Sequence, residues 1–253
     1  MGLVIAVANQ KGGVGKTTTV INLGAALAAL DRKVAIVDLD PQANATSGLG
    51  FAKNEAGPNS YSLLSGLPGV LRPTAFPNLS LLPSTRDLVG AEIELVESRD
   101  RELRLRLALE PLRGEADYLL VDCPPALSLL TINALTAADI LLVPVQAEYF
   151  ALEGVSELLD TVERVRNAFN PTLVVEGVVL TMYDERTNLA RQVAEDIRRH
   201  LGGLVYKAVI PRSVRLAEAP SFGKPALSYD IKSRGAQAYL ELAREFLKRR
   251  KVA

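Results

Sequence analysis

The stretch NQKGGVGKTT, residues 9–18, holds the residue types in this chain that are most suited to chemistry. Its glycines let successive backbone N–H groups close on a phosphate, and a helix starting at Lys16 would add the positive end of its dipole. In the pattern G-x-x-x-x-G-K-[ST], Lys16 contacts the β- and γ-phosphates and the Thr17 hydroxyl ligates Mg²⁺. Position 10 departs from this pattern, because Gln10 stands where the first glycine is expected.

The alternative is that these glycines only form a turn between a strand and a helix. The Lys-Thr pair lies at the correct offset after the apolar run LVIAVA, which favours a phosphate-binding loop. The predicted nucleotide-binding residues of the loop are Gly12, Gly13, Val14, Gly15, Lys16, Thr17 and Thr18. A phosphate loop needs one lysine, so the motif leaves Lys11 unexplained.

Two more apolar runs end in aspartate: VAIVDLD supplies Asp38 and Asp40, and YLLVD supplies Asp122. The carboxyl ends of strands are where open α/β sheets bind ligands. Carboxylates hold Mg²⁺, commonly through water, so we predict Asp38 and Asp122 at a metal site. Asp40 lies just past its strand and is predicted to orient a water molecule against the γ-phosphate. Each aspartate could instead cap a helix. The neighbouring phosphate loop favours a functional role for Asp40 and Asp122, and less strongly for Asp38.

Apolar, β-branched runs alternate with helical patterns along the chain. Such continuous runs are typical of a parallel sheet buried on both faces. Strands are predicted at 3–8, 33–38, 79–84, 117–123, 139–145, 174–182 and 204–210. Helices are predicted at 16–30, 87–110, 128–138, 150–168, 188–201 and 234–250. We therefore expect an α/β fold with a single doubly wound, mainly parallel sheet flanked by helices, in one domain over 1–253. Residues 50–78 are expected to form a loose surface excursion.

The composition restricts the class of protein. Hydrophobic residues make up 48% of 253, and 29 basic residues balance 29 acidic ones, so contact with nucleic acid or membrane would need a local patch. One cysteine, Cys123, excludes a disulfide framework and a cysteine-built cluster or zinc site within one chain. Neither a signal peptide nor a bilayer-spanning run is visible, so we expect a cytoplasmic protein.

Five motifs together resemble the ParA/Soj family of chromosome and plasmid partition ATPases. They are KGGVGKTT, VDLDPQANAT, VDCPPALSLLTINAL, PVQAEYFALEG and IPRSVRLAEAPSFGKP. The resemblance covers essentially the whole chain, and Lys11 matches the extra lysine of the family's deviant phosphate loop. It implies that two subunits sandwich two ATP molecules, with Lys11 of one reaching the phosphates bound by the other. Lys11, Lys16 and Asp40 would then be catalytic, and ATP and Mg²⁺ the cofactors. The alternative for Lys11 is a solvated loop lysine.

The same resemblance implies the partners. The ATP-bound homodimer would bind double-stranded DNA without sequence preference, through Arg186 and Arg215, and would associate with the nucleoid. A ParB-type centromere-binding protein would stimulate slow ATP hydrolysis. In relatives, the segments that contain Met182 and Pro211–Arg212 frame the adenine, and Arg212 is predicted to contact the nucleotide for that reason.

Two other classes of protein share parts of these motifs. A MinD-like membrane switch would use the C-terminal segment AYLELAREFLKRRKVA as an amphipathic surface helix. Only Val252 and Ala253 follow its basic cluster, so we favour a helix packed on the core and no membrane contact. An iron protein of the nitrogenase type needs two cysteines per subunit, and Cys123 alone does not supply them.

Overall fold

The computed structural model describes residues 1–252 and contains a seven-stranded sheet in the order β3-β4-β2-β5-β1-β6-β7. All neighbouring strands run parallel except β3, which is antiparallel to β4. The strands are β1 (Leu3–Val7), β2 (Val34–Asp38), β3 (Arg72–Pro73), β4 (Leu79–Leu82), β5 (Tyr118–Asp122), β6 (Ile140–Gln146) and β7 (Val174–Thr181).

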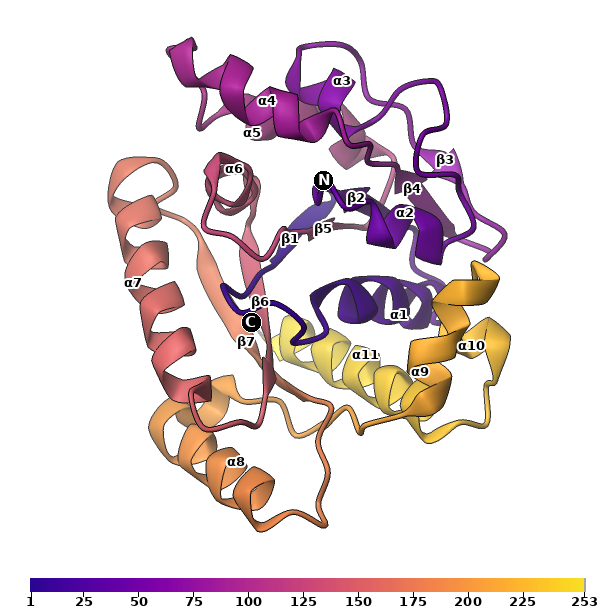
Figure 1. Ribbon diagram of the computed structural model, residues 1–253, viewed down its shortest axis with the longest axis vertical. Coiled ribbons are helices and arrows are strands. Elements are labelled where there is room, and N and C mark those ends of the chain that lie inside the picture. Colours follow the sequence, from indigo (N-terminus) through magenta and orange to yellow (C-terminus); the bar gives the residue numbers. More distant parts are fainter. Residues whose placement is uncertain (253) are drawn as a thin grey trace.

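Helices cover both faces of this sheet (Figure 1). They are α1 (Lys16–Ala29), α2 (Asn44–Gly48), α3 (Ser60–Leu64), α4 (Leu88–Glu94), α5 (Arg104–Leu109), α6 (Leu129–Ala137), α7 (Ala151–Ala168), α8 (Asn188–Leu201), α9 (Val214–Glu218), α10 (Ala226–Tyr229) and α11 (Arg234–Val252). Short 3₁₀ turns join them at Leu95–Glu97, Pro111–Gly114, Gly202–Leu204 and Ala219–Phe222. The predicted doubly wound, mainly parallel α/β fold is therefore confirmed.

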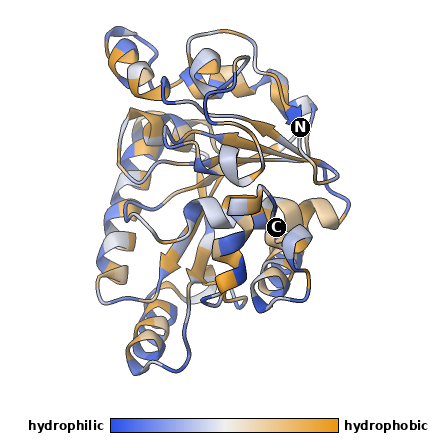
Figure 2. Ribbon diagram, turned by 45° about the vertical axis from the view of Figure 1, so that its right-hand side comes forward, coloured by the Kyte–Doolittle hydropathy of each residue, from blue (hydrophilic) through white to orange (hydrophobic). Residues whose placement is uncertain are grey.

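Alternate residues of the central strands feed two separate cores. In β1, Val4 and Ala6 pack with the core under α6 and α7, whereas Ile5 and Val7 pack with the core under α1 and α11. This alternation follows from the pleat of a strand, which points successive side chains to opposite faces. Because both faces are covered, nearly every position of these strands is apolar, and Figure 2 shows strands dominated by hydrophobic residues.

Six of the seven predicted strands are present, and the prediction of a strand at 204–210 is wrong. That segment makes only isolated bridges, Val205 with Val178 and Pro211 with Tyr183. The carboxylate of Glu245 in α11 accepts the N–H groups of Lys207 (3.0 Å) and Ala208 (2.9 Å). Tyr206 and Ile210 still donate to carbonyls of β7 (2.9 and 2.8 Å), but the N–H of Ala208 between them does not, so the ladder is interrupted and no regular strand forms.

The predicted helix at 87–110 is also wrong as one element, since it divides into α4, a 3₁₀ turn and α5. Asn133 of α6 stabilises the bend between them. Its side chain accepts the N–H of Leu105 (3.0 Å) and donates to the carbonyl of Arg101 (2.7 Å). The expected loose excursion at 50–78 contains α3 and β3, so it is partly ordered against the sheet.

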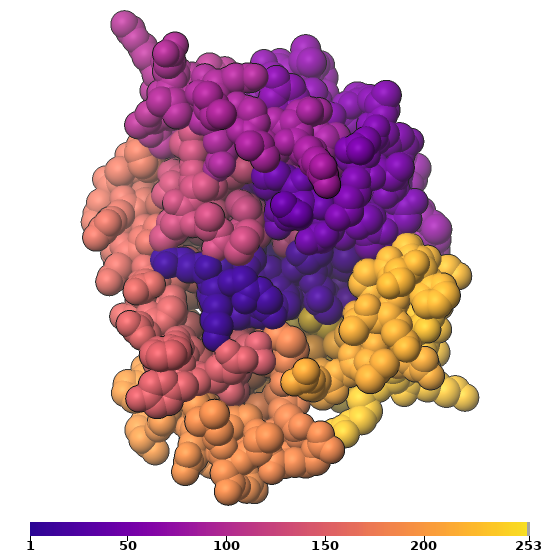
Figure 3. Space-filling model, in the orientation of Figure 1, coloured from indigo at the N-terminus to yellow at the C-terminus, as the bar shows by residue number. Residues whose placement is uncertain are grey.

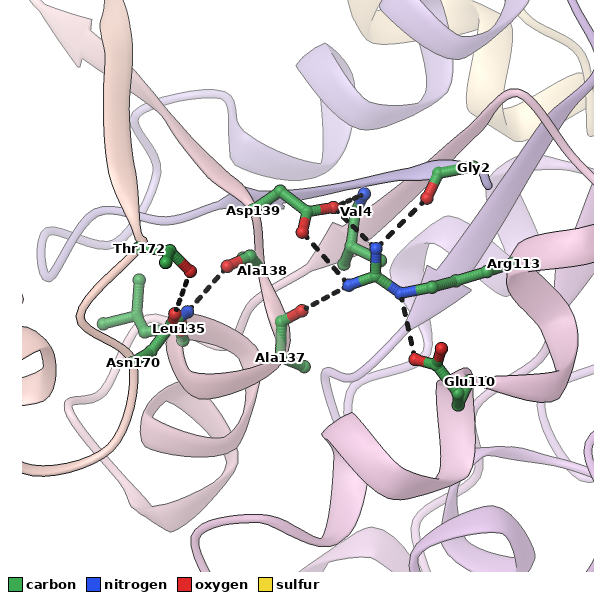
Figure 4. A network of polar contacts seen from close by, with 10 residues as sticks. All are labelled: Gly2, Val4, Glu110, Arg113, Leu135, Ala137, Ala138, Asp139, Asn170 and Thr172. Atoms are coloured by element: carbon green, nitrogen blue, oxygen red, sulfur yellow. Dashed lines mark hydrogen bonds and ion pairs between the residues drawn. The ribbon is translucent and has the colours of Figure 1, made fainter.

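An ion pair joins the start of β1 to the start of the neighbouring strand β6 and to the 3₁₀ turn Pro111–Gly114 (Figure 4). Asp139 accepts two hydrogen bonds from the guanidinium of Arg113 (2.9 and 3.2 Å) and one from the N–H of Val4 (2.7 Å). Arg113 also donates to the carbonyls of Gly2 and Ala137, both at 3.3 Å. The first strand is therefore anchored at its beginning, at the opposite end of the strand from the loop of residues 9–18.

Replacing Asp139 with alanine should lower the free energy of unfolding by about 1–3 kcal/mol, because the Val4 N–H and the Arg113 guanidinium lose their acceptor. Urea denaturation of both proteins measures this. Asp160→Ala is the matched control, since Asp160 is an exposed acidic residue of α7. An equal effect of the two substitutions would contradict the anchoring function of Asp139.

Candidate nucleotide site

The loop between β1 and α1 has the backbone that a phosphate cradle requires. Gly13 and Gly15 adopt left-handed conformations, with φ of 76° and 85°. A Cβ added at Gly15 would come no closer than 3.7 Å to another atom, so glycine is needed there for its backbone angle and not for space. Gly15 directly precedes α1, which places the first N–H groups of that helix at the loop. In Figure 3 the indigo loop reaches the surface in the middle of the face shown.

Lys16 is the first residue of α1 and is 7% exposed. Its ammonium donates to the carbonyl of Lys11 across the loop (3.1 Å). Burial lowers the pKa of Lys16, while the negative charges of Asp122 and Asp40 oppose this shift. A desolvated cation inside a ring of N–H donors is well suited to bind a polyanion.

Asp122 ends β5 and lies in register with Asp38 of β2. It is fully buried, and within residues 1–252 neither of its carboxylate oxygens has a hydrogen-bond partner. Burial and the neighbouring charge of Asp38 raise the pKa of Asp122 well above its usual range, although Thr17 and Lys16 lie close enough to lower it. A carboxylate without donors fits a hard cation, which prefers oxygen ligands.

Asp38 occupies the same position on the next strand but is fully engaged. One oxygen accepts the N–H (2.8 Å) and hydroxyl (2.7 Å) of Thr46, and the other accepts the N–H of Asp40 (3.2 Å). Burial raises the pKa of Asp38 to about 6 despite these hydrogen bonds. Metal contact through Asp38 stays a prediction, and its hydrogen bonds join the backbone of Asp40 to α2.

Asp40 is 7% exposed and lines the cleft beside the loop. One of its oxygens accepts the N–H of Gln42 (2.9 Å), which closes a local turn. The residue that precedes α2 is Ala43, in a left-handed conformation and without a side-chain cap, so Asp40 does not cap this helix. Among residues 1–252, no hydrogen bond to the other oxygen of Asp40 is found.

The cleft has a volume of about 670 Å³ and brings together segments from across the chain. It is lined by the loop, Asp40 and the predicted residues Met182, Pro211 and Arg212. Hydrogen bonds of Tyr183 N–H to Ile210 (3.0 Å) and of Arg212 N–H to Tyr183 (3.2 Å) hold the last two segments together. Several uncharged residues that were not predicted as site residues also line the cleft: Gln42, Pro125, Thr181, Val214 and Tyr239.

Lys11 points away from its own loop. Its ammonium forms an ion pair with Glu148, which follows β6, and both side chains are 42% exposed. The N–H of Lys11 donates to Asn9 (2.9 Å), and the buried Asn9 amide donates to the carbonyl of Pro144 (2.8 Å). The predicted cross-subunit lysine is therefore held at the surface by a partner that the sequence analysis did not identify.

Both predicted DNA-contacting arginines are exposed and already paired. Arg186 is 85% exposed and donates to both oxygens of Asp184 (2.8 and 2.6 Å), which holds the pKa of Asp184 at about 2. Arg215 is 52% exposed and contacts Glu218 (2.9 Å) and Asp230 (3.4 Å). An incoming phosphate would have to compete with these carboxylates.

Comparisons with known proteins agree with this geometry. A family model described as an AAA domain matches residues 2–175. The chromosome partitioning protein ParA of Caulobacter vibrioides (strain NA1000 / CB15N) is 54% identical over 251 residues, 97% of this chain and 94% of the relative. The sporulation initiation inhibitor protein Soj of Bacillus subtilis (strain 168) is 54% identical over 248 residues, 97% of this chain and 98% of the relative. The chain belongs to the ParA/Soj family.

The family assignment made from five motifs is thereby confirmed. Outside the named ParA/Soj relatives, a crystal structure of cobyrinic acid a,c-diamide synthase from Mycobacterium smegmatis, with bound ADP and magnesium, superposes with a TM-score of 0.86. It is 40% identical and covers 99% of this chain and 96% of its own. The identity to the two ParA/Soj proteins is higher, so the partition ATPases are the better guide to this family member.

The C-terminal helix of this ParA/Soj family member packs on the core, as predicted. Leu242, Ala243 and Phe246 are fully buried in the same core as α1, and Leu240 and Leu247 pack partly against it. The apolar face of α11 is thus covered by protein, at variance with a helix that lies on a membrane surface. Within residues 1–252, none of the helices combines the length and the apolar character needed to cross a bilayer. Ala253 of the predicted tail lies outside the described residues.

Proposed function

We propose that this chain is an ATP-dependent switch for DNA partitioning, and that the described residues act as one ATPase domain that binds ATP with Mg²⁺. The observation that carries the nucleotide assignment is Asp122, a buried carboxylate without a hydrogen-bond donor beside Thr17 and Lys16. These residues fit a metal-bound triphosphate, because the cation would satisfy Asp122 and the phosphates would satisfy Lys16. The mycobacterial structure with ADP and magnesium supports the same pair of cofactors here.

Each part of the site has a distinct function in this proposal. The N–H groups of residues 12–18 cradle the phosphates, and Lys16 neutralises their charge. Thr17 and Asp122, with Asp38 behind them, hold Mg²⁺, which when bound balances the charge on the phosphate oxygens. Asp40 orients the attacking water. Three predicted residues that also line the cleft frame the base: Met182, Pro211 and Arg212.

Lys11 links nucleotide binding to association. In this proposal two subunits face each other with ATP between them. The side chain of each Lys11 extends across the interface to the phosphates bound by the partner. A cation supplied only by the second subunit makes the ATP state the dimeric state. The dimer then doubles the patch that contains Arg186 and Arg215. It binds double-stranded DNA, so the cytoplasmic protein is associated with the nucleoid. A ParB-type protein releases it by stimulating hydrolysis.

The decisive test is DNA retardation with ATP, with ADP and without nucleotide. We expect retardation with ATP only, and weaker retardation of Arg186→Ala and Arg215→Ala. Because a dimer loses one phosphate contact per subunit in each variant, the dependence of log K on log salt concentration should fall by about 2. Arg199→Ala is the matched control, since Arg199 of α8 is 71% exposed and also forms an ion pair, with Asp196. Equal DNA binding in all three nucleotide states would contradict the switch.

A further inference from the structure

A buried polar network surrounds the backbone that carries Asp40. Its members come from four separate segments: Asp38 ends β2, Thr46 lies in α2, Ser60 begins α3 and Ser84 follows β4. All four are 0% exposed. Burying polar side chains costs free energy unless every one is hydrogen-bonded, so such a network is a precise and rigid arrangement.

The Thr46 hydroxyl is the centre of this network. It donates to the carboxylate of Asp38 (2.7 Å) and accepts the N–H of Ser84 (2.9 Å). The N–H of Thr46 donates to the same oxygen of Asp38 (2.8 Å). The other oxygen of Asp38 accepts the N–H of Asp40 (3.2 Å). Thr46 is thus connected to Asp40 through a single carboxylate.

Two serine hydroxyls hold the same backbone through its carbonyl groups. Ser84 donates to the carbonyl of Asp40 (2.7 Å), and Ser60 donates to the carbonyl of Asp38 (2.5 Å). The N–H of Ser60 donates to the carbonyl of Pro83 (2.9 Å), which joins the two serines. The N–H and the carbonyl of Asp40 are therefore both fixed by groups that lie outside the cleft.

We infer that Thr46 and Ser84 are positioning residues for Asp40, which set the place of its carboxylate and through it the rate of ATP hydrolysis. Neither side chain is exposed, so neither touches the nucleotide. This inference rests on the proposed function of Asp40 as the water-orienting group. It also assigns a function to the region of α3 and β4, which supplies Ser60 and Ser84 from outside the nucleotide motifs.

Substitution of Thr46 tests the inference through separate effects on kcat and KM. Thr46→Val fills similar space but loses both hydroxyl hydrogen bonds, and we expect kcat to fall about tenfold, because a catalytic group displaced by a fraction of an ångström loses much of its effect. KM for ATP should change less than about twofold, because the phosphate loop is intact. Thr46→Ser keeps the hydroxyl and should retain kcat within about twofold. Ser47→Ala is the control in the same helix, since that hydroxyl bonds only to carbonyls of residues 43 and 44.

A second variant and a second measurement keep the inference testable if Thr46→Val folds poorly. Ser84→Ala removes the hydrogen bond to the Asp40 carbonyl and a longer one to the carbonyl of Thr85 (3.5 Å), and it should lower kcat about threefold to tenfold with KM unchanged. Hydrogen exchange of the nucleotide-free protein should be faster over residues 38–48 in Thr46→Val than in Thr46→Ser.

Asp40→Ala distinguishes the proposed function of Asp40 from the positioning function of Thr46 and Ser84. If it hydrolyses ATP at the wild-type rate, the proposed function of Asp40 fails. If Asp40→Ala is inactive while Thr46→Val and Ser84→Ala keep wild-type kcat, the positioning inference alone is overturned. A loss of ATP affinity in parallel with kcat in both variants would also overturn it, because the network would then support binding and not the chemical step.

Discussion

Replacing Lys16 with alanine is expected to weaken the binding of Mg-ATP at least about a hundredfold. Lys16 is almost fully buried and reaches across the loop to the carbonyl of Lys11, so its charge lies inside the phosphate cradle. Hydrogen bonds to charged groups contribute about 1.5–3 kcal/mol each, and this cation also offsets the buried charges of Asp122 and Asp40. The backbone N–H groups that remain cannot replace a full positive charge against a triphosphate.

Calorimetry with Mg-ATP measures this loss directly. Lys33→Ala is the matched control, because Lys33 is an exposed lysine just before β2, at the other end of the strand from Asp38. Wild-type affinity in Lys16→Ala would mean that the loop of residues 9–18 is a structural turn and that ATP binds elsewhere or not at all.

Most of the fold follows from local sequence pattern, because strands buried on both faces are apolar at nearly every position. The errors arise where a distant side chain competes for backbone groups. Glu245 takes two N–H donors from the segment 204–210, and Asn133 stabilises the bend inside 87–110. Neither contact can be read from the local run, since each partner is more than 25 residues away in the chain.

The candidate site is likewise predictable where local sequence determines it, and unpredictable where distant contacts do. The loop motif and the strand-end aspartates located the cleft, but two aspartates with the same local pattern differ in environment: Asp38 has three donors and Asp122 has none among residues 1–252. Their hydrogen bonds depend on how α2 packs, which no spacing in the sequence specifies. The partner of Lys11 is likewise invisible to a motif, since Glu148 follows it by 137 residues.

Lys11→Ala should leave ATP binding by the monomer nearly intact and abolish ATP-dependent dimerisation. Lys16 and the loop N–H groups stay in place, so each subunit still holds its nucleotide. The dimer, however, would lose two charge-assisted contacts of about 1.5–3 kcal/mol each, which raises its dissociation constant about a hundredfold or more. Light scattering with ATP measures this best in an Asp40→Ala background, where hydrolysis does not deplete the ATP state. If Lys11→Ala dimerises at the same protein concentration as the wild type, Lys11 is a solvated loop lysine with no function in dimerisation.

Glu148→Gln is the matched variant, because it frees Lys11 without removing the cation. Each subunit must break its Lys11–Glu148 ion pair before Lys11 can reach the partner's phosphates, and a symmetric dimer breaks two. Half-exposed ion pairs are worth about 0.2–1 kcal/mol, so Glu148→Gln should tighten the dimer about twofold to thirtyfold. Glu153→Gln, on an exposed position of α7, should have no effect. A weaker dimer in Glu148→Gln would show instead that this carboxylate contacts the second subunit, and Lys11 would then not be held back by it.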